Sequence, residues 1–205
     1  MTHIVDCVTA YDSKRMKVTL DNGGVAFILY KGEFRNLQLS EGKELSEEDL
    51  SALYRNILLP RAKKRSAYYL KNGDKTEFQI RRKLKEGCYP DPVIEETIEC
   101  LRHYKFADDE RYAENMLDSL RGKYSRKEIE SKLYMKGLPA EIIREMVSQI
   151  TPEEEEEACV KALRKKCTGD RRKDFSSLLR KGFSYEACEH ALSEAGAYEE
   201  EESFL

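Results

Sequence analysis

Residues 125–139 read SRKEIESKLYMKGLP, and this stretch decides the fold. Ser125 and Glu128 have the spacing of a capping box, in which each side chain accepts the backbone N–H of the other residue. Ile129 and Leu133 lie four residues apart and therefore share one helix face. Gly137 readily adopts the left-handed conformation that ends a helix. The stretch predicts a short helix with a defined start, a buried face and a defined end.

The same pattern occurs three times along the chain. An offset of 49 residues places Thr76 on Ser125, and an offset of 45 places Ser125 on Asp170 and Gly137 on Gly182. Repeats of about 45 residues are typical of helical arrays, in which each copy is one supersecondary unit. The sequence therefore predicts three tandem copies of one helical unit.

Each copy contains three helical segments with one apolar face each. The first helices are predicted at 60–71, 109–121 and 152–166. The second helices follow the caps named above, and the third helices carry apolar residues spaced three and four apart, beginning at Val93, Ile142 and Ala187. The first copy departs from the pattern after its second helix, where Gly87-Cys88 precedes an additional Pro90-Asp91-Pro92.

The residues before the first copy have a different period. Alternating apolar residues predict a strand at 3–10 and a β-hairpin over 15–30. A further short strand is predicted at 37–39. Ser46 is expected to cap a helix that Pro60 ends, because proline restricts the residue before it and opens helices well.

We therefore expect a mainly α protein, with three tandem three-helix repeats preceded by a small β-rich unit. The predicted segments are a separate β-meander with one helix, the three repeats, and an acidic tail, at 1–59, 60–105, 106–150, 151–197 and 198–205.

Composition limits the class of protein. The chain has 205 residues, of which 37% are charged and 40% hydrophobic. No apolar run approaches the roughly 20 residues that a membrane span needs, so we expect a soluble cytoplasmic protein without membrane contact. The six cysteines form no Cys-x-x-Cys pair, which excludes a zinc ribbon and favours reduced thiols.

Motifs of common enzymes are missing from the sequence. It has no phosphate-binding loop, no His-Glu-x-x-His and no Gly-x-Ser-x-Gly, so we expect neither an enzyme nor a cofactor. Cys100 and His103 fit one helix face, yet further metal ligands are not evident. Asp108-Asp109-Glu110 is interpreted as a helix start, because adjacent helix residues point in different directions. No metal site is predicted.

Positive charge is concentrated in two stretches of a chain whose net charge is −3. Residues 60–105 hold 12 Lys/Arg against 7 Asp/Glu, and residues 161–181 hold nine against two. Such clusters contact nucleic-acid phosphates in many proteins, but they also occur as solvated helix faces. Both interpretations stay open for the candidate binding residues, which are Arg61, Lys63, Lys64, Arg65, Arg81, Arg82, Lys85, Arg164, Lys165, Arg171, Arg172 and Lys173.

The repeat pattern Thr/Ser-x-x-x-φ-x-x-Lys-Leu, in which φ is apolar, resembles the RecX regulatory proteins of bacteria. So does the link Phe106-Ala107-Asp108-Asp109-Glu110-Arg111-Tyr112-Ala113 between the first two copies. The stretch from Leu20-Asp21-Asn22 through residues 41–49 also resembles the β-rich extension of RecX proteins from some Gram-positive bacteria.

The resemblance implies an elongated, curved stack of repeats that binds the RecA recombinase filament on DNA. It also implies inhibition of recombination and ATP hydrolysis by that filament, and hence a role in DNA repair, homologous recombination and the SOS response. We expect a monomer that contacts DNA weakly and mainly through the filament. The alternative is a helical-repeat scaffold for protein interactions that have no connection with DNA.

Overall fold

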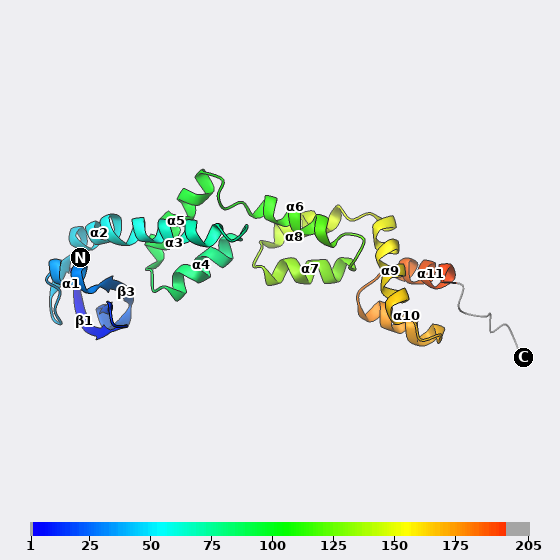
Figure 1. The fold of residues 1–205 in the computed structure, drawn as a ribbon, viewed down its shortest axis with the longest axis horizontal. Helices are drawn as coiled ribbons and strands as arrows, with labels where there is room; N and C mark the ends of the chain where they lie inside the picture. The colour runs from blue at the N-terminus through cyan, green and yellow to red at the C-terminus, as the bar shows by residue number, and fades with distance from the viewer. Residues whose placement is uncertain (1, 196–205) are drawn as a thin grey trace, which may run out of the picture. The chain divides into compact units, whose positions relative to one another are not determined.

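The computed structural model describes residues 2–195, and the predicted acidic tail at 198–205 lies outside them (Figure 1). The chain is mainly helical with one small antiparallel sheet near the N-terminus, as the sequence predicts. It divides between Asp108 and Asp109 into two compact units.

The sheet of the first unit has four antiparallel strands in the order β3-β2-β1-β4. Its first three strands are β1 (Thr2–Ala10), β2 (Arg15–Leu20) and β3 (Val25–Tyr30), which confirms the predicted strand and hairpin. Val18 lies opposite Phe27 in the hairpin, and both side chains are fully buried. The alternating apolar side chains thus lie on the side of the sheet that faces the core.

The predicted strand at 37–39 is wrong. Residues Lys31–Asn36 form a short helix, α1, and the fourth strand is β4 (Glu44–Ser46), which pairs with β1. Gln38 has a φ of +49°, which breaks an extended conformation between the two leucines. Leu39 is buried as part of the core instead. The alternating spacing of two leucines therefore predicted a strand that the backbone does not form.

The prediction that Pro60 ends a helix is also wrong. Helix α2 (Glu47–Leu53) begins at the predicted Ser46 cap and runs through a π-helical stretch, Tyr54–Leu58, directly into α3 (Leu59–Leu70). Proline lacks an N–H and its ring collides with the carbonyl four residues earlier. The wider π turns displace that carbonyl, and the helix therefore continues past the proline.

The sheet and the first helical triplet share one hydrophobic core. Its buried side chains run from Val5 in the sheet to Ala107 behind the third helix. The expectation of a separate unit at 1–59 is corrected by this finding, because the boundary after residue 59 falls inside a continuous helix. The division between Asp108 and Asp109 instead falls close to the predicted boundary between the first two repeats.

The three predicted helical triplets are present. They are α3 with α4 (Glu77–Glu86) and α5 (Asp91–His103); α6 (Asp109–Leu120), α7 (Arg126–Met135) and α8 (Ala140–Ser148); and α9 (Pro152–Lys166), α10 (Arg171–Arg180) and α11 (Tyr185–Glu194). Thr76, Ser125 and Asp170 each accept the backbone N–H three residues ahead, as their cap positions predict. The second and third triplets have separate cores.

The turn between the second and third helices is the same in all three triplets. Gly137 and Gly182 have φ values of +77° and +87°, and Cys88 takes that place in the first triplet with a φ of +54°. Helix α5 begins at Asp91, which is 49 residues before Ala140 at the start of α8. Pro90-Asp91-Pro92 is therefore no addition to the first copy, and the expectation of one is corrected.

The second unit joins its two triplets through polar contacts at their adjoining helix ends. Ser125 donates its hydroxyl to the carbonyl oxygen of Lys181 at 2.5 Å, in addition to capping α7. Arg126 contacts the buried carboxylate of Glu155 at 2.9 Å. The cap that starts α7 thus also fixes the position of the third triplet.

Candidate nucleic-acid interface

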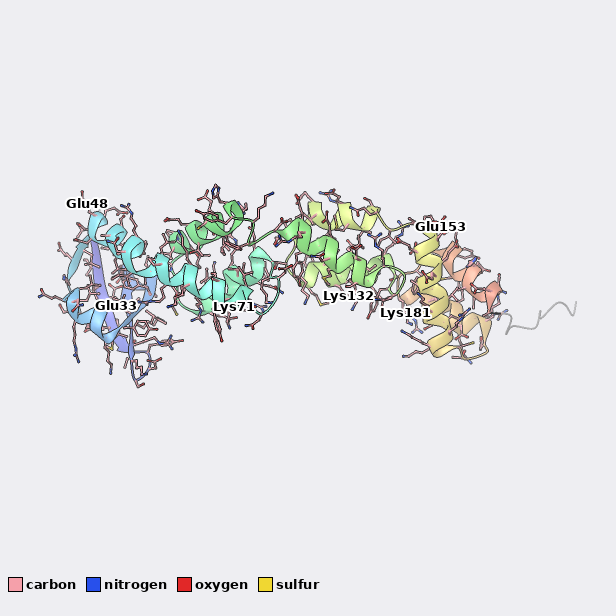
Figure 2. All side chains as sticks on the ribbon, turned by 45° about the horizontal axis from the view of Figure 1, so that its top comes forward. Glu33, Glu48, Lys71, Lys132, Glu153 and Lys181 are labelled. Carbon is pink, nitrogen blue, oxygen red and sulfur yellow. The ribbon has the colours of Figure 1, made fainter. Side chains whose placement is uncertain are left out.

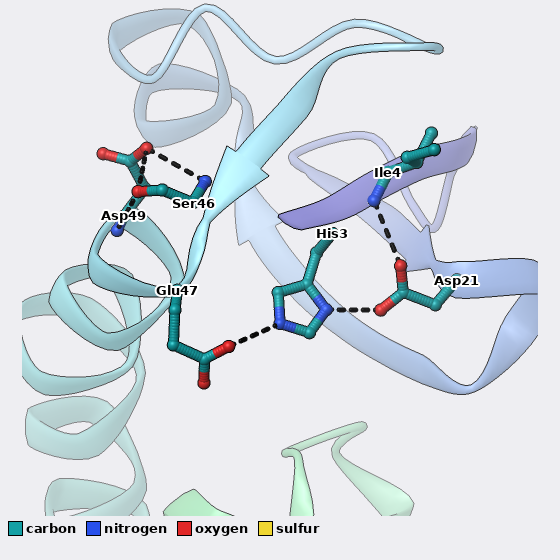
Figure 3. Close-up of polar contacts among 6 residues, drawn as sticks. All are labelled: His3, Ile4, Asp21, Ser46, Glu47 and Asp49. Atoms are coloured by element: carbon teal, nitrogen blue, oxygen red, sulfur yellow. Dashed lines mark hydrogen bonds and ion pairs between the residues drawn. The ribbon is translucent and has the colours of Figure 1, made fainter. Parts of the chain in front are cut away.

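His3 lies between two carboxylates beside the sheet (Figure 3). Its Nδ1 lies 2.5 Å from Asp21 Oδ2, and its Nε2 lies 3.1 Å from Glu47 Oε2. Asp21 also accepts the backbone N–H of Ile4 at 3.1 Å. Hydrogen bonds to the two carboxylates raise the pKa of His3. Both ring nitrogens are hydrogen bonded, so the imidazole connects β1 to the turn at Asp21 and to α2, and neither nitrogen is free to act as a catalytic base.

Metal-ligand clusters and membrane-spanning helices are both absent from the described part of the chain. Within residues 2–195, no three His, Cys, Asp or Glu side chains gather so that they could hold a metal ion. None of the helices formed by these residues is long and apolar enough to cross a membrane. The remaining candidate sites are therefore the two basic stretches.

Arg61 is a structural residue of the first unit. Its guanidinium donates to the carbonyl oxygen of Ile28 at 2.9 Å and forms an ion pair with Glu33, which lies on α1 (Figure 2). It also covers the ring of Tyr30 at 4.7 Å from the centroid. These contacts fasten α3 to β3 and α1, so the charge of Arg61 is already compensated.

A cleft of about 280 Å³ lies between the sheet and α3. Arg61, Lys64 and Arg65 reach it from α3, together with Arg15 from β2. Burial raises the pKa of the Tyr89 hydroxyl, while the charges of Arg61 and Arg65 oppose that rise. The guanidinium groups therefore lie close to the tyrosine that lines the cleft.

Lys63 lies on the same helix as these residues but does not line the cleft. It is half-buried, and no described residue forms an ion pair with it. The sequence prediction thus named three of the four cations that line the cleft and added one neighbour.

The cations of α4 lie outside this cleft. Arg81 forms ion pairs with Glu95 on α5 and with Glu77, so it holds two helices together. Arg82 and Lys85 are on the exposed side, with 63% of each side chain accessible. They pair with Glu86 and Asp91 at 3.8 and 3.2 Å, respectively. Surface pairs of this kind are weak and exchange readily for other partners.

The third triplet carries a second basic depression, of about 690 Å³. Four cations line it, namely Lys166, Arg172, Lys173 and Arg180. Lys173 also pairs with the cap residue Asp170 at 3.0 Å, which raises the pKa of the lysine. The backbone N–H of Lys173, together with this pair, lowers the pKa of the aspartate.

The other predicted cations of the third triplet lie outside this depression. Arg164 pairs with Glu194 at 3.0 Å and Arg171 with Glu189 at 2.6 Å, so both tie their helices to α11. Lys165 is exposed, and no described residue pairs with it.

Residues that the sequence analysis did not name complete both basic surfaces. Arg15 and Tyr30 in the first cleft are paired neighbours in the hairpin, so the register of the predicted turn places them together. Lys166 and Arg180 belong to the basic stretch at 161–181 but were not among the candidate residues. Only the folded helices show that they share a depression with Arg172 and Lys173.

Comparison with known proteins finds similarity to RecX proteins. Residues 62–101 match the family model described as "RecX, first three-helix domain", and residues 108–147 match "RecX, second three-helix domain". A protein of Caldanaerobacter subterraneus called "Regulatory protein RecX" is 29% identical over 88% of this chain and 93% of its own length. A protein of the same name from Bacillus pumilus is 28% identical over 80% of this chain and 66% of its own.

Two solved structures have a similar fold. One, described as "Crystal structure of regulatory protein RecX", has a TM-score of 0.61 and 25% identity, and the match covers 93% of this chain and 99% of that one. The RecX structure from Lactobacillus salivarius has a TM-score of 0.60 and 23% identity over 67% of this chain and 96% of its own.

Proposed function

Because the chain belongs to the RecX family of regulatory proteins, we propose that it binds the RecA recombinase filament on DNA and inhibits it. The observation that carries this proposal is the match of two consecutive triplets to the first and second three-helix domains of that family. Inhibition would cover both strand exchange and ATP hydrolysis by the filament, and would take place in the cytoplasm.

The arrangement of side chains supports action by binding alone. The His3 cluster has no free ring nitrogen, and the described residues hold no group of metal ligands. We therefore propose that the protein has no ATPase or nuclease activity of its own. A bound regulator of this kind changes the filament by occupying it, and its effect follows its binding affinity.

The charge distribution supports binding to DNA that is already part of a filament. The net charge of −3 gives no long-range attraction to naked duplex DNA. The two basic surfaces are local, and three of the eight cations that line them, Arg15, Arg61 and Lys173, form ion pairs with acidic residues of the chain. Contact with phosphates would follow docking on the protein filament, and a monomer would suffice for it.

The test is an activity measurement on the cognate recombinase. Filaments assembled on circular single-stranded DNA are titrated with the full chain, and ATP hydrolysis and strand exchange are followed. We expect both rates to fall as protein is added until each reaches a low plateau. The chain alone should hydrolyse no ATP. Assembled filaments that keep full activity at saturating protein, or ATP hydrolysis by the purified chain, would contradict the proposal.

A further inference from the structure

We propose that the cleft between the sheet and α3 binds one nucleotide of single-stranded DNA, with its phosphate at Lys64 and Arg65 and its base stacked on Tyr68. This inference rests on the proposed function, because it names the part of the chain that would contact the DNA of the filament. It also gives the N-terminal sheet a role in recognition.

The size of the cleft suits a small occupant. Five parts of the first unit form it: β2, the end of β3, the π-helical stretch, α3, and the turn at 87–89. Its volume of about 280 Å³ is near the lower end of ligand sites, which begin at about 300 Å³. A single nucleotide fits this description, whereas a duplex with its stacked bases would have to remain outside.

The charges around the cleft favour an anion. Four cations and no acidic residue are among the described residues that line it. Arg15 and Arg61 have carboxylate partners in Asp12 and Glu33. Lys64 and Arg65 form no ion pair with any described residue, so their charges are available. These two are the residues that a phosphate would engage.

Arg65 shows a further sign of an incomplete set of partners. Its Nε is buried and has no hydrogen-bond acceptor among the described residues. Glu86 lies within electrostatic range of Arg65, but this carboxylate is hydrogen bonded to Lys83 at 3.0 Å. A buried donor without an acceptor costs stability, and a phosphate on the part of this half-buried guanidinium that lines the cleft would add charged hydrogen bonds beside it.

Tyr68 supplies a free aromatic face at the rim. It lines the cleft, and 72% of it is exposed. The ring of Tyr30 is already covered by Arg61. Because Lys64 and Tyr68 are four residues apart on α3, they share one helix face. Every base has a flat π face, so a ring beside phosphate-binding cations is a general device for holding single strands.

The ring of Tyr68 distinguishes single-stranded DNA from an acidic peptide as the ligand of the cleft. Carboxylates of a peptide would use Lys64 and Arg65 but would gain little from an exposed ring. A single strand uses both the charges and the ring. Binding that depends on the ring of Tyr68 therefore distinguishes the two kinds of partner.

The experiment measures binding of a fluorescent 15-nucleotide oligo(dT) to the full chain by anisotropy at several salt concentrations. The variants are Lys64→Gln/Arg65→Gln, Tyr68→Leu and Tyr68→Phe. The matched controls remove exposed groups that do not line the cleft, as Lys71→Gln/Arg144→Gln and Tyr134→Leu. Melting curves establish that each variant is folded, and Lys64→Gln alone replaces the double variant if Arg65 is needed for folding.

We expect the double charge variant to flatten the slope of log affinity against log salt by about 1.4, since each phosphate contact contributes about 0.7 for single strands. Tyr68→Leu should weaken binding at least about fivefold, the equivalent of about 1 kcal/mol for a lost stacking contact. Tyr68→Phe and both controls should bind within about twofold of the parent.

Two results would overturn the inference: a parent chain that fails to bind the oligonucleotide, and a Tyr68→Leu variant that binds as the parent does. Displacement of the oligonucleotide by oligo-glutamate from the parent and from Tyr68→Leu alike would assign the cleft to an acidic peptide and also overturn it. Inhibition of the assembled filament is measured separately. A parent that inhibits the filament without binding the oligonucleotide retains the proposed function and loses only this site.

Discussion

Replacing Gly182 by alanine should loosen the joint between the second and third triplets. Gly182 has a φ of +87°, and an added Cβ would lie 2.5 Å from Cβ and 2.8 Å from Cδ of Lys127 on α7. The lysine Cδ can swing away, but its Cβ is fixed to the helix. Helix α7 would have to shift, which would strain the hydrogen bond from Ser125 to the carbonyl oxygen of Lys181.

The cost has two parts that a matched variant separates. A non-glycine residue in a left-handed conformation costs about 1–2 kcal/mol, and forcing atoms into a packed site costs about 1–3 kcal/mol. Gly169 has a similar φ of +81°, yet an added Cβ there would meet nothing within 4 Å. Gly169→Ala therefore carries only the backbone cost. We expect Gly182→Ala to lose about 1–3 kcal/mol more free energy of unfolding than Gly169→Ala.

Urea unfolding followed by circular dichroism at 222 nm measures this difference, because the chain is mainly helical and has no tryptophan. Similar slopes of the transitions in the two variants would show that they unfold in the same way. Equal losses for Gly182→Ala and Gly169→Ala would refute the reasoning, since the contact with α7 would then carry no energetic weight.

Three further predictions concern the charges. The pKa of His3 is raised in the folded state. The contribution of His3 to stability is therefore complete below the pKa of an unfolded histidine, about 6.5, and is lost as the pH rises through the pKa of the folded state. The melting temperatures of the parent and His3→Gln should differ more at pH 5.5 than at pH 9. Arg61→Gln should cost about 1–3 kcal/mol in urea unfolding, because charged hydrogen bonds to β3 and α1 are lost, whereas Lys71→Gln should stay within about 0.5 kcal/mol. Lys165→Glu/Arg172→Glu should leave the melting temperature unchanged and weaken filament inhibition at low salt; unchanged inhibition would mean that these cations form only a solvated face.

The helical triplets were predictable because their signals are local. The capping pairs that begin at Thr76 and Ser125 lie within four residues of sequence, and each glycine turn follows at a fixed distance. The repeated pattern then reinforced each weak signal. Cys88 stands where the pattern expects a glycine, and it still adopts the left-handed conformation of that position. The offset of 49 holds across this turn.

The structure between the hairpin and the first triplet was not predictable in the same way. The strand β4 is defined by its pairing with β1, some 40 residues earlier in the chain. The continuation of the helix past Pro60 depends on π turns that leave no simple mark in the sequence. Both features arise from packing in a shared core, which local patterns do not report.

The basic surfaces were predictable as stretches of charge but not as sites. Sequence alone gave Arg61 and Lys64 equal weight, since both are cations on one predicted helix. In the structure Arg61 is paired with Glu33, 28 residues away, whereas Lys64 has no acidic partner among the described residues. Which cations are available is decided by long-range partners.

The most direct test of the proposed function compares three binding partners for the full chain. Labelled protein is titrated with recombinase filaments on single-stranded DNA, with the same naked DNA, and with the free recombinase, all at physiological salt. We predict tight binding to the filament and much weaker binding to either component alone. Equal affinity for the filament and for the free recombinase, or no binding to the filament, would contradict the proposal and favour a scaffold that acts independently of DNA.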